Sequence, residues 1–488
     1  MLLPLLPLFA QEDRQIAPHE CSEWAAADLV RIPKELQPYI RYVALWNQSN
    51  LDERIEATAA LSVAFNSMGR RSHLQPLGVV DGSKISVLRL NLKDLARDAH
   101  EAKRLLTVWE KLYDPYTTVK GEYWPGGIDT KDGRNYPVGR YNRAKNPVQP
   151  GPWMGPAWND LAKWSHSAIP MVNGDFIGHW FMTMTDAQGD LSVPSYADFL
   201  GFKNEKEFQR VVAVDVTLAE ETEWVRREAV GISGVTRKAR AFVFLGKIGG
   251  WYYKTLDFKD NRGPRNPLEN LGKGIEEHAQ ATEQIAGLTN GLFAYGLFDL
   301  TKKDHPVVDR APDVVAGSRT LPGNFLAVQN PIGCVDCHRK KALQPIDGWI
   351  KRQLTAPLDI FSPDYEKVQE LRDQYMRGLD KALEQGRVVY DDAVQELTAR
   401  AGKKMTAEQY ADAIRKMFVR YESPRTMQTA AAYMGTTPGQ LRAAMQQRIG
   451  QVRATLSLSH LMDGEVPYDI FEDQLEEAHN VLRGYVKK

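Results

Sequence analysis

The amino-acid sequence predicts an α+β fold in which a mixed N-terminal region is followed by a mainly helical C-terminal region. Short segments rich in aromatic and β-branched residues, which are typical of strands, alternate with helical patterns up to about residue 320. All eleven tryptophans lie at or before Trp349. Beyond it, amphipathic stretches are separated by Ser, Thr, Pro and Gly, a pattern that indicates successive helices.

Four segments of the N-terminal region predict regular structure. Residues 92–112 read as a helix, and residues 241–245 and 293–298 as strands. Residues 84–90 are a weaker strand candidate, because Arg89 interrupts their apolar face. Residues 121–158 contain six prolines and three tryptophans, so they predict an irregular insertion.

The first helices of the C-terminal region are predicted from their caps. Pro363 could open a helix that Gly386 closes, since proline suits the first helical position and glycine the residue after the last turn. Thr406 could cap a second helix. Its apolar positions recur at helical spacing: Tyr410, Ile414, Met417 and Phe418.

Three further helical predictions follow toward the C-terminus. Ser423–Pro424 could open a third helix, and residues 471–486 predict a last amphipathic one. Residues 430–445 read as two short helices joined by a glycine turn. Because acidic and basic residues balance over residues 350–488, we expect residues 430–445 to form a structural αα-hairpin rather than a DNA-reading motif.

Composition limits the class of protein. The 488 residues carry 62 basic and 62 acidic side chains, so the net charge is zero and no global basic field attracts nucleic acid. Three cysteines cannot build a disulfide framework. No run approaches 18 apolar residues, so we expect no transmembrane segment.

The chain is expected to divide into three parts. Residues 1–10 form an apolar stretch that resembles the core of a secretory signal, with the small residue Ala10 where cleavage could occur. A basic flank is missing, so a frayed apolar terminus is the alternative. Residues 11–320 form the mixed α/β region that includes the insertion, and residues 321–488 hold a cysteine motif and the helical region.

The cysteine motif is Cys334-Val335-Asp336-Cys337-His338, the attachment pattern of c-type haem. Residues three apart on a helical turn share a face, so Cys334 and Cys337 can each add to one vinyl group of a porphyrin. His338 then supplies the proximal ligand of the iron. This pattern predicts one covalent haem c, and attachment of haem c outside the bacterial cytoplasm agrees with an exported, periplasmic protein.

The motif has three other interpretations. The cysteines could be buried thiols beside an unrelated histidine. They could form a redox-active pair, although the thioredoxin-like βαβ context is missing. Zinc requires four ligands, and Cys21 is the only cysteine left to help provide them.

The second axial ligand is less well indicated. Met405, 67 residues beyond His338, is the first candidate, because a thioether suits an electron carrier; methionines in such helices are more often core residues. The histidines at positions 166, 179, 278 and 460 are further candidates. An open sixth position would instead favour ligand binding or peroxide chemistry.

Ordered sequence blocks between residues 38 and 345 resemble a group of large exported bacterial proteins that carry a c-type cytochrome motif and are common in planctomycete-type genomes. The resemblance implies an exported haem protein with a family-specific α/β region; it implies no reaction and no distal ligand. The blocks that carry it are Pro38–Tyr42, Leu45–Asn47, Arg89–Asp94, Trp109–Tyr113, His179–Phe181, Pro194–Tyr196, Phe199–Gly201, Ser233–Thr236, Gly250–Lys254, Leu288–Leu292, Ala294–Tyr295 and Asn330–Gly333.

These observations predict an exported monohaem c-type protein that transfers electrons to or from an unidentified redox partner. Two alternatives stay open: a haem enzyme or gas sensor with an open distal site, and a binding or surface protein in which the haem is structural. The α/β region keeps both open, because it is far larger than an electron carrier needs.

Overall fold

The computed structural model describes most of the chain. The residues outside its description are 1–14, 113, 120–148, 183–195, 215–224, 233–238, 248–249, 267–269, 271–274, 309–319, 322–324, 327–330, 339–359, 362, 364, 367–368, 370–378 and 483–488. The predicted signal segment 1–10, most of the predicted insertion 121–158 and much of the predicted helix 362–386 therefore lie outside the described residues.

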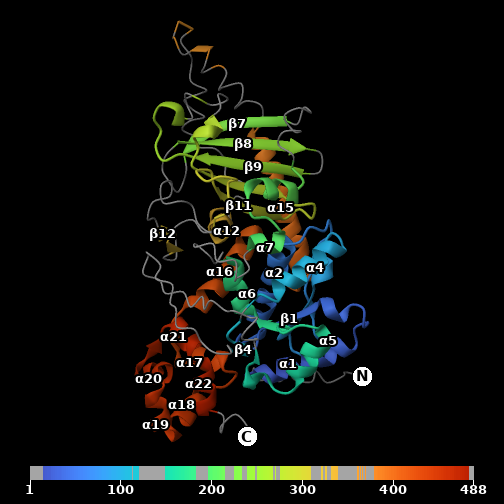
Figure 1. The fold of residues 1–488 in the computed structure, drawn as a ribbon, viewed down its shortest axis with the longest axis vertical. Helices are drawn as coiled ribbons and strands as arrows, with labels where there is room; N and C mark the ends of the chain where they lie inside the picture. Colours follow the sequence, from blue (N-terminus) through green and yellow to red (C-terminus); the bar gives the residue numbers. More distant parts are fainter. Residues whose placement is uncertain are drawn as a thin grey trace, which may run out of the picture.

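The described residues form three stacked parts (Figure 1). An antiparallel sheet lies at one end, a mixed α/β body in the middle, and a cluster of short helices at the other end. The predicted α+β class and the helical C-terminal region are both confirmed.

The central body is built on a four-stranded sheet of order β2-β3-β1-β6. Strand β1 pairs antiparallel with β3 and parallel with β6. All five residues of β1 are buried. The strand bounds are β1 Ile40–Ala44, β2 Gly78–Val79, β3 Val87–Asn91 and β6 Met171–Asn173.

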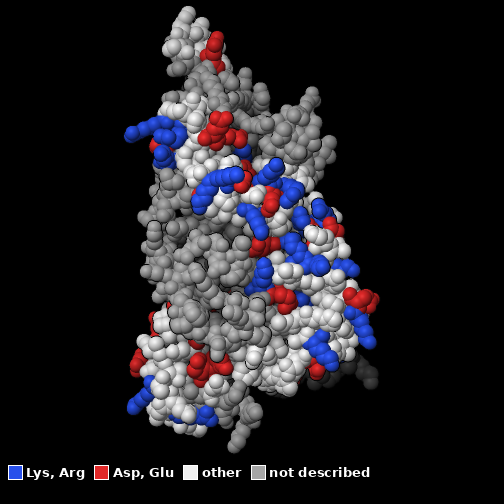
Figure 2. Space-filling model, viewed as in Figure 1, with Lys and Arg blue, Asp and Glu red and all other residues white. Residues whose placement is uncertain are grey.

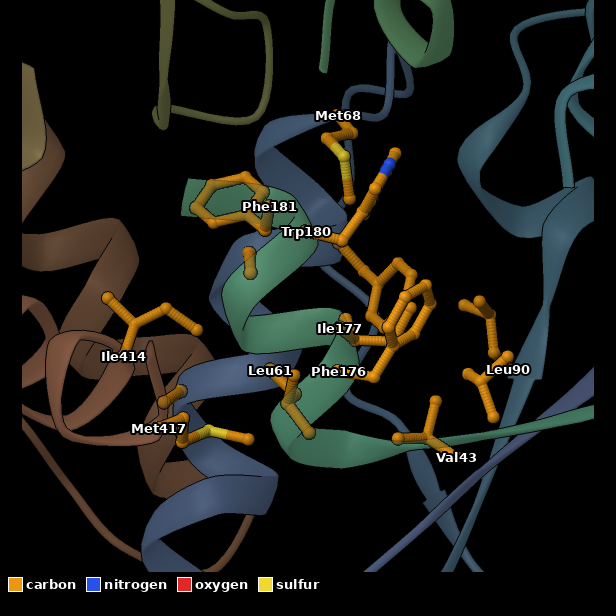
Figure 3. Packing of buried hydrophobic residues seen from close by; sticks show 14 of the residues in the cluster. Val43, Leu61, Met68, Leu90, Phe176, Ile177, Trp180, Phe181, Ile414 and Met417 are labelled. Atoms are coloured by element: carbon orange, nitrogen blue, oxygen red, sulfur yellow. The ribbon is translucent and has the colours of Figure 1, made fainter. Parts of the chain in front are cut away.

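The core of this body lies around α6 (Gly174–Met182), between α2 (Leu51–Ser67), α16 (Ala407–Glu422) and the sheet. Figure 3 shows Phe176 and Ile177 of α6 close to the sheet residues Val43 and Leu90. At Gly178 an added Cβ would meet Met417 Cβ at 2.8 Å, so glycine permits the close approach of α6 and α16.

The second sheet is a five-stranded antiparallel meander of order β11-β10-β9-β8-β7. Its strands are β7 Val225–Ile232, β8 Ala239–Lys247, β9 Gly250–Asp257, β10 Ala281–Gly287 and β11 Phe293–Asp299. The long helix α15 (Leu379–Arg400) joins this sheet to the central body. Tyr390 of α15 stacks on Phe293 at a ring distance of 3.9 Å, and Arg400 Nη1 donates to the carbonyl of Leu74.

The remaining elements cover these sheets or form the C-terminal cluster. Those of the N-terminal region are α1 Pro18–Val30, α3 Leu92–Leu95, α4 Ala99–Trp109, β4 Thr118–Val119, β5 Gln149–Pro150, α5 Ala157–Ser165, α7 Tyr196–Leu200 and α8 Glu205–Val211. Those of the later chain are β12 Thr320–Leu321, β13 Phe325–Leu326, α12 Ile332–His338, β14 Arg425–Thr426, α17 Met427–Tyr433, α18 Pro438–Gln447, α19 Ile449–Ala454, α20 Leu456–Asp463, β15 Glu465–Val466, α21 Tyr468–Asp473 and α22 Leu475–Leu482.

Several sequence predictions agree with these elements. Strands β8 and β11 contain the predicted segments 241–245 and 293–298, and β3 occupies the end of the weaker candidate 84–90. Thr406 caps α16 through a reciprocal capping box with Gln409, and the four predicted apolar positions of that helix are buried. Residues 430–445 fall on α17 and α18, with Gly435 at φ +67° in the turn between them.

Four helix boundaries were predicted wrongly. The helix expected over 92–112 is divided into α3 and α4, because the Asp98 side chain caps α4 by accepting from the Glu101 N–H. Gly386 lies inside α15 rather than at its end. The helix expected at Ser423–Pro424 starts at Met427, since Arg425–Thr426 pairs as β14 with β15. The last expected helix is divided at Gln474 into α21 and α22.

The outer surface agrees with the neutral composition. On the face shown in Figure 2, Lys and Arg side chains are interspersed with Asp and Glu over the described residues. Within the described part of the chain, no helix is both long and apolar enough to cross a bilayer.

A buried arginine joins the C-terminal cluster to the central body. Arg425 is fully buried, and its guanidinium lies 4.5 Å from the ring centre of Tyr433 and donates to the hydroxyl of Tyr116 at 2.8 Å. Glu472 of α21 accepts from the Tyr116 hydroxyl at 2.7 Å and lies 3.4 Å from Arg425 Nη2. Asp114, also fully buried, accepts from the Tyr116 N–H.

The two buried carboxyl groups around Tyr116, those of Asp114 and Glu472, should make the protein less stable as pH rises. Burial raises the pKa of Asp114 from 3.8 to about 7, against opposing hydrogen bonds from the Asn173 and Tyr116 N–H groups and the Thr117 hydroxyl. Burial likewise raises the pKa of Glu472 from 4.5 to about 7, against the opposing charge of Arg425. Between about pH 5 and 7 the folded state therefore binds more protons than the unfolded state, and the free energy of unfolding should fall as pH rises.

Urea unfolding at successive pH values measures this dependence. The Asp114→Asn variant, which cannot ionise, should show a shallower fall than the unmodified protein. A free energy of unfolding that stays level or increases from pH 5 to 7 would contradict the assignment.

Candidate functional site

The cysteine motif forms one short helix. Residues Ile332–His338 make α12, and the Val335 N–H donates to the carbonyl of Pro331 at 2.9 Å. Cys334 and His338 are four residues apart, so they share a face of this helix. Cys334 is fully buried and His338 is 8 % exposed, so this face points into the protein.

Helix α12 lies between the five-stranded sheet and α16 (Figure 1). The buried Cys334 thiol lies beside a group of buried tyrosines. Tyr196 of α7 accepts at its hydroxyl from the N–H of Tyr295 on β11, at 3.2 Å. Burial, together with neighbouring hydroxyls and the Cys334 thiol, raises the pKa of Tyr295 well above its usual range, so this tyrosine is neutral.

His338 faces a carboxylate of the sheet. Its Nε2 lies 3.7 Å from Oε1 of Glu283 on β10, an ion-pair distance that is longer than a hydrogen bond. The other ring nitrogen, Nδ1, is buried and has no hydrogen-bond partner among the described residues. A buried nitrogen without a partner is costly, so His338 has one ring nitrogen that a further ligand could satisfy.

Glu283 belongs to a chain of charged groups across the sheet. Arg240 of β8 forms a two-pronged pair with Asp257 of β9, with Nε–Oδ1 at 2.8 Å and Nη2–Oδ2 at 2.6 Å. Its Nη1 lies 3.7 Å from Glu283 Oε2. Burial would raise the pKa of Glu283, but His338, Arg240 and the Cys334 thiol outweigh it and lower that pKa to about 2. Glu283 is therefore anionic at neutral pH.

These residues fit a covalently attached haem. Cys334 and His338 share a buried face of α12, and Nδ1 of His338 has no hydrogen-bond partner within the part of the chain that the structure describes. Haem c requires an imidazole nitrogen as a ligand of its iron and thiols that form thioether bonds with its vinyl groups. Cys337 lies in the same helical turn, and its side chain is outside the described residues.

The distal candidates lie in different parts of the fold. Met405 is buried in the turn before α16, where its N–H donates to the Thr398 hydroxyl at 2.9 Å. Since α12 packs on α16, Met405 precedes a helix that contacts the motif. His179 of α6 instead pairs with Glu422 at 3.1 Å. His166 ends α5, His278 ends a 3-10 turn, and His460 lies in α20.

Sequence reasoning missed Glu283, Arg240 and the tyrosines around Cys334. Glu283 is separated from His338 by 55 positions, and the sequence shows only an acidic residue in a short segment. Its role depends on pairing between β10 and β9 and on where α12 packs. Among the residues that the structure describes, no group of three or more His, Cys, Asp or Glu side chains is arranged to hold a metal ion.

Comparison with known proteins gives no match to this chain among family models, curated proteins or solved structures. The resemblance carried by the sequence blocks stays a prediction, and the interpretation of the site rests on its own residues.

Proposed function

We propose that the protein is an exported, monohaem c-type protein that transfers electrons to or from a partner protein. Cys334 and Cys337 would hold the haem through two thioether bonds, and His338 would be its proximal ligand. The observation that carries the proposal is the motif helix itself: α12 buries Cys334 and His338 on one face, and among the residues that the structure describes none bonds to Nδ1 of His338.

The surrounding residues would perform the protein's share of the work. Bound haem would supply an iron that cycles between the ferric and ferrous states. Cys334, Cys337 and His338 of α12 would hold the cofactor, and the buried tyrosines and α16 would exclude water from it. Such burial and the axial ligand are the means by which a protein sets the potential of haem.

A spectrum of the reduced protein, produced with the haem-attachment machinery and recorded with and without carbon monoxide, tests this function. Electron transfer predicts a six-coordinate spectrum that carbon monoxide leaves unchanged, as a second ligand such as Met405 would give. Rapid binding of carbon monoxide would overturn electron transfer in favour of an open distal site. Absence of a haem spectrum would overturn both.

A further inference from the structure

We propose that Glu283 is a positioning residue for the proximal ligand, holding one nitrogen of the His338 imidazole while the other binds the iron, and so makes the proposed haem a low-potential centre. This inference rests on the proposed function. It names a residue of the five-stranded sheet, remote from the cysteine motif in sequence, as part of the haem environment.

The geometry leaves each nitrogen of His338 one role. Nε2 faces Glu283 Oε1 at 3.7 Å, and Nδ1 has no hydrogen-bond partner among the described residues. In this orientation Nε2 is the nitrogen turned toward the carboxylate, and Nδ1 is the nitrogen left for a metal.

Glu283 has the charge and the fixed position that this role requires. It is 8 % exposed and lies within β10, which is paired on both sides, by β9 and β11. Arg240 Nη1 lies 3.7 Å from Glu283 Oε2, and the short contacts of Arg240 are with Asp257 instead. The carboxylate of Glu283 is thus left facing His338 rather than being fully paired with an arginine.

A carboxylate on the outer nitrogen of a ligating histidine fixes the ring and makes it a stronger electron donor. Stronger donation stabilises the ferric state more than the ferrous state, because the ferric iron carries the greater charge. The midpoint potential should therefore be lower with Glu283 present than without it.

The decisive variant is Glu283→Gln, which keeps the shape of the side chain and removes its charge. Its matched control is Asp257→Asn, which removes a neighbouring buried charge from the same sheet where the partner is Arg240. Both variants and the unmodified protein are checked for covalent haem by intact mass and then titrated electrochemically. We expect Glu283→Gln to retain haem and to shift the ferric–ferrous equilibrium at least tenfold, or about 59 mV, toward ferrous, with a smaller shift in the control.

Equal shifts in the two variants, or none in Glu283→Gln, would overturn the inference while leaving the proposed function standing. If Glu283→Gln does not fold, Glu283→Asp is the deciding variant, because it moves the carboxylate away from His338 by one methylene. The midpoint potential of Glu283→Asp should rise, by less than that expected for Glu283→Gln. An unchanged midpoint potential in Glu283→Asp would also overturn the inference. An unmodified protein without covalent haem would overturn both proposals.

Discussion

Replacing Cys334 and Cys337 together by alanine is expected to abolish covalent haem attachment completely. Thioether bonds require the two sulfur atoms, and no other cysteine of the chain can supply one at this helix. Intact mass under denaturing conditions should show the polypeptide alone. A pyridine haemochrome measurement of the precipitated and washed protein should show no haem.

Cys21 provides the matched control for this variant. It is fully buried in α1, its sulfur lies 3.9 Å from the carbonyl oxygen of Ser86, and burial raises the pKa of its thiol well above the usual range. Cys21→Ala should therefore keep covalent haem in full. Covalent haem that persists in the double variant, or disappears with Cys21→Ala alone, would refute the assignment of the attachment site.

The largest effect on stability is expected from Asp175→Ala. Asp175 is fully buried at the start of α6 and accepts two hydrogen bonds from Arg420, at 2.6 Å each, and one each from Asn47 at 2.7 Å and Tyr433 at 2.9 Å. Its charge outweighs the effect of burial and raises the pKa of Arg420 above the usual range. Removing the carboxylate leaves a largely buried guanidinium and two polar groups unpaired. This should lower the free energy of unfolding by about 3–5 kcal/mol.

Urea unfolding measures that loss, and Asp94→Ala is the matched comparison. Asp94 lies 3.8 Å from Arg71, and both side chains are about one-third exposed. Its removal should cost about 0–1 kcal/mol, because solvent screens such a pair. Similar losses in the two variants would show that the Asp175 network does not hold α6, α16 and α17 together.

The success of the sequence predictions depends on how local their causes are. Thr406 was identified as a helix cap because its partner, Gln409, lies three residues away. The strands β8 and β11 were found because their composition is typical of strands. Gly386 was misread as a helix end, since its propensity is overridden by the burial of Tyr390, Val394 and Leu397 in the same helix.

Local signals also account for the part of the site that the sequence predicts. The motif at Cys334, Cys337 and His338 is contiguous, so the sequence alone could propose its chemistry. Glu283 reaches His338 only through the pairing of β10 and the packing of α12, neither of which leaves a local sequence signal. Asp175 joins Asn47, Arg420 and Tyr433 across most of the chain for the same reason.

The intact mass of the unmodified protein, produced in a bacterial periplasm with the haem-attachment machinery, tests the central claim most directly. Measured after denaturation, which removes any haem that is not covalently bound, the mass should exceed that of the polypeptide by one haem. A mass equal to that of the polypeptide alone would contradict the account.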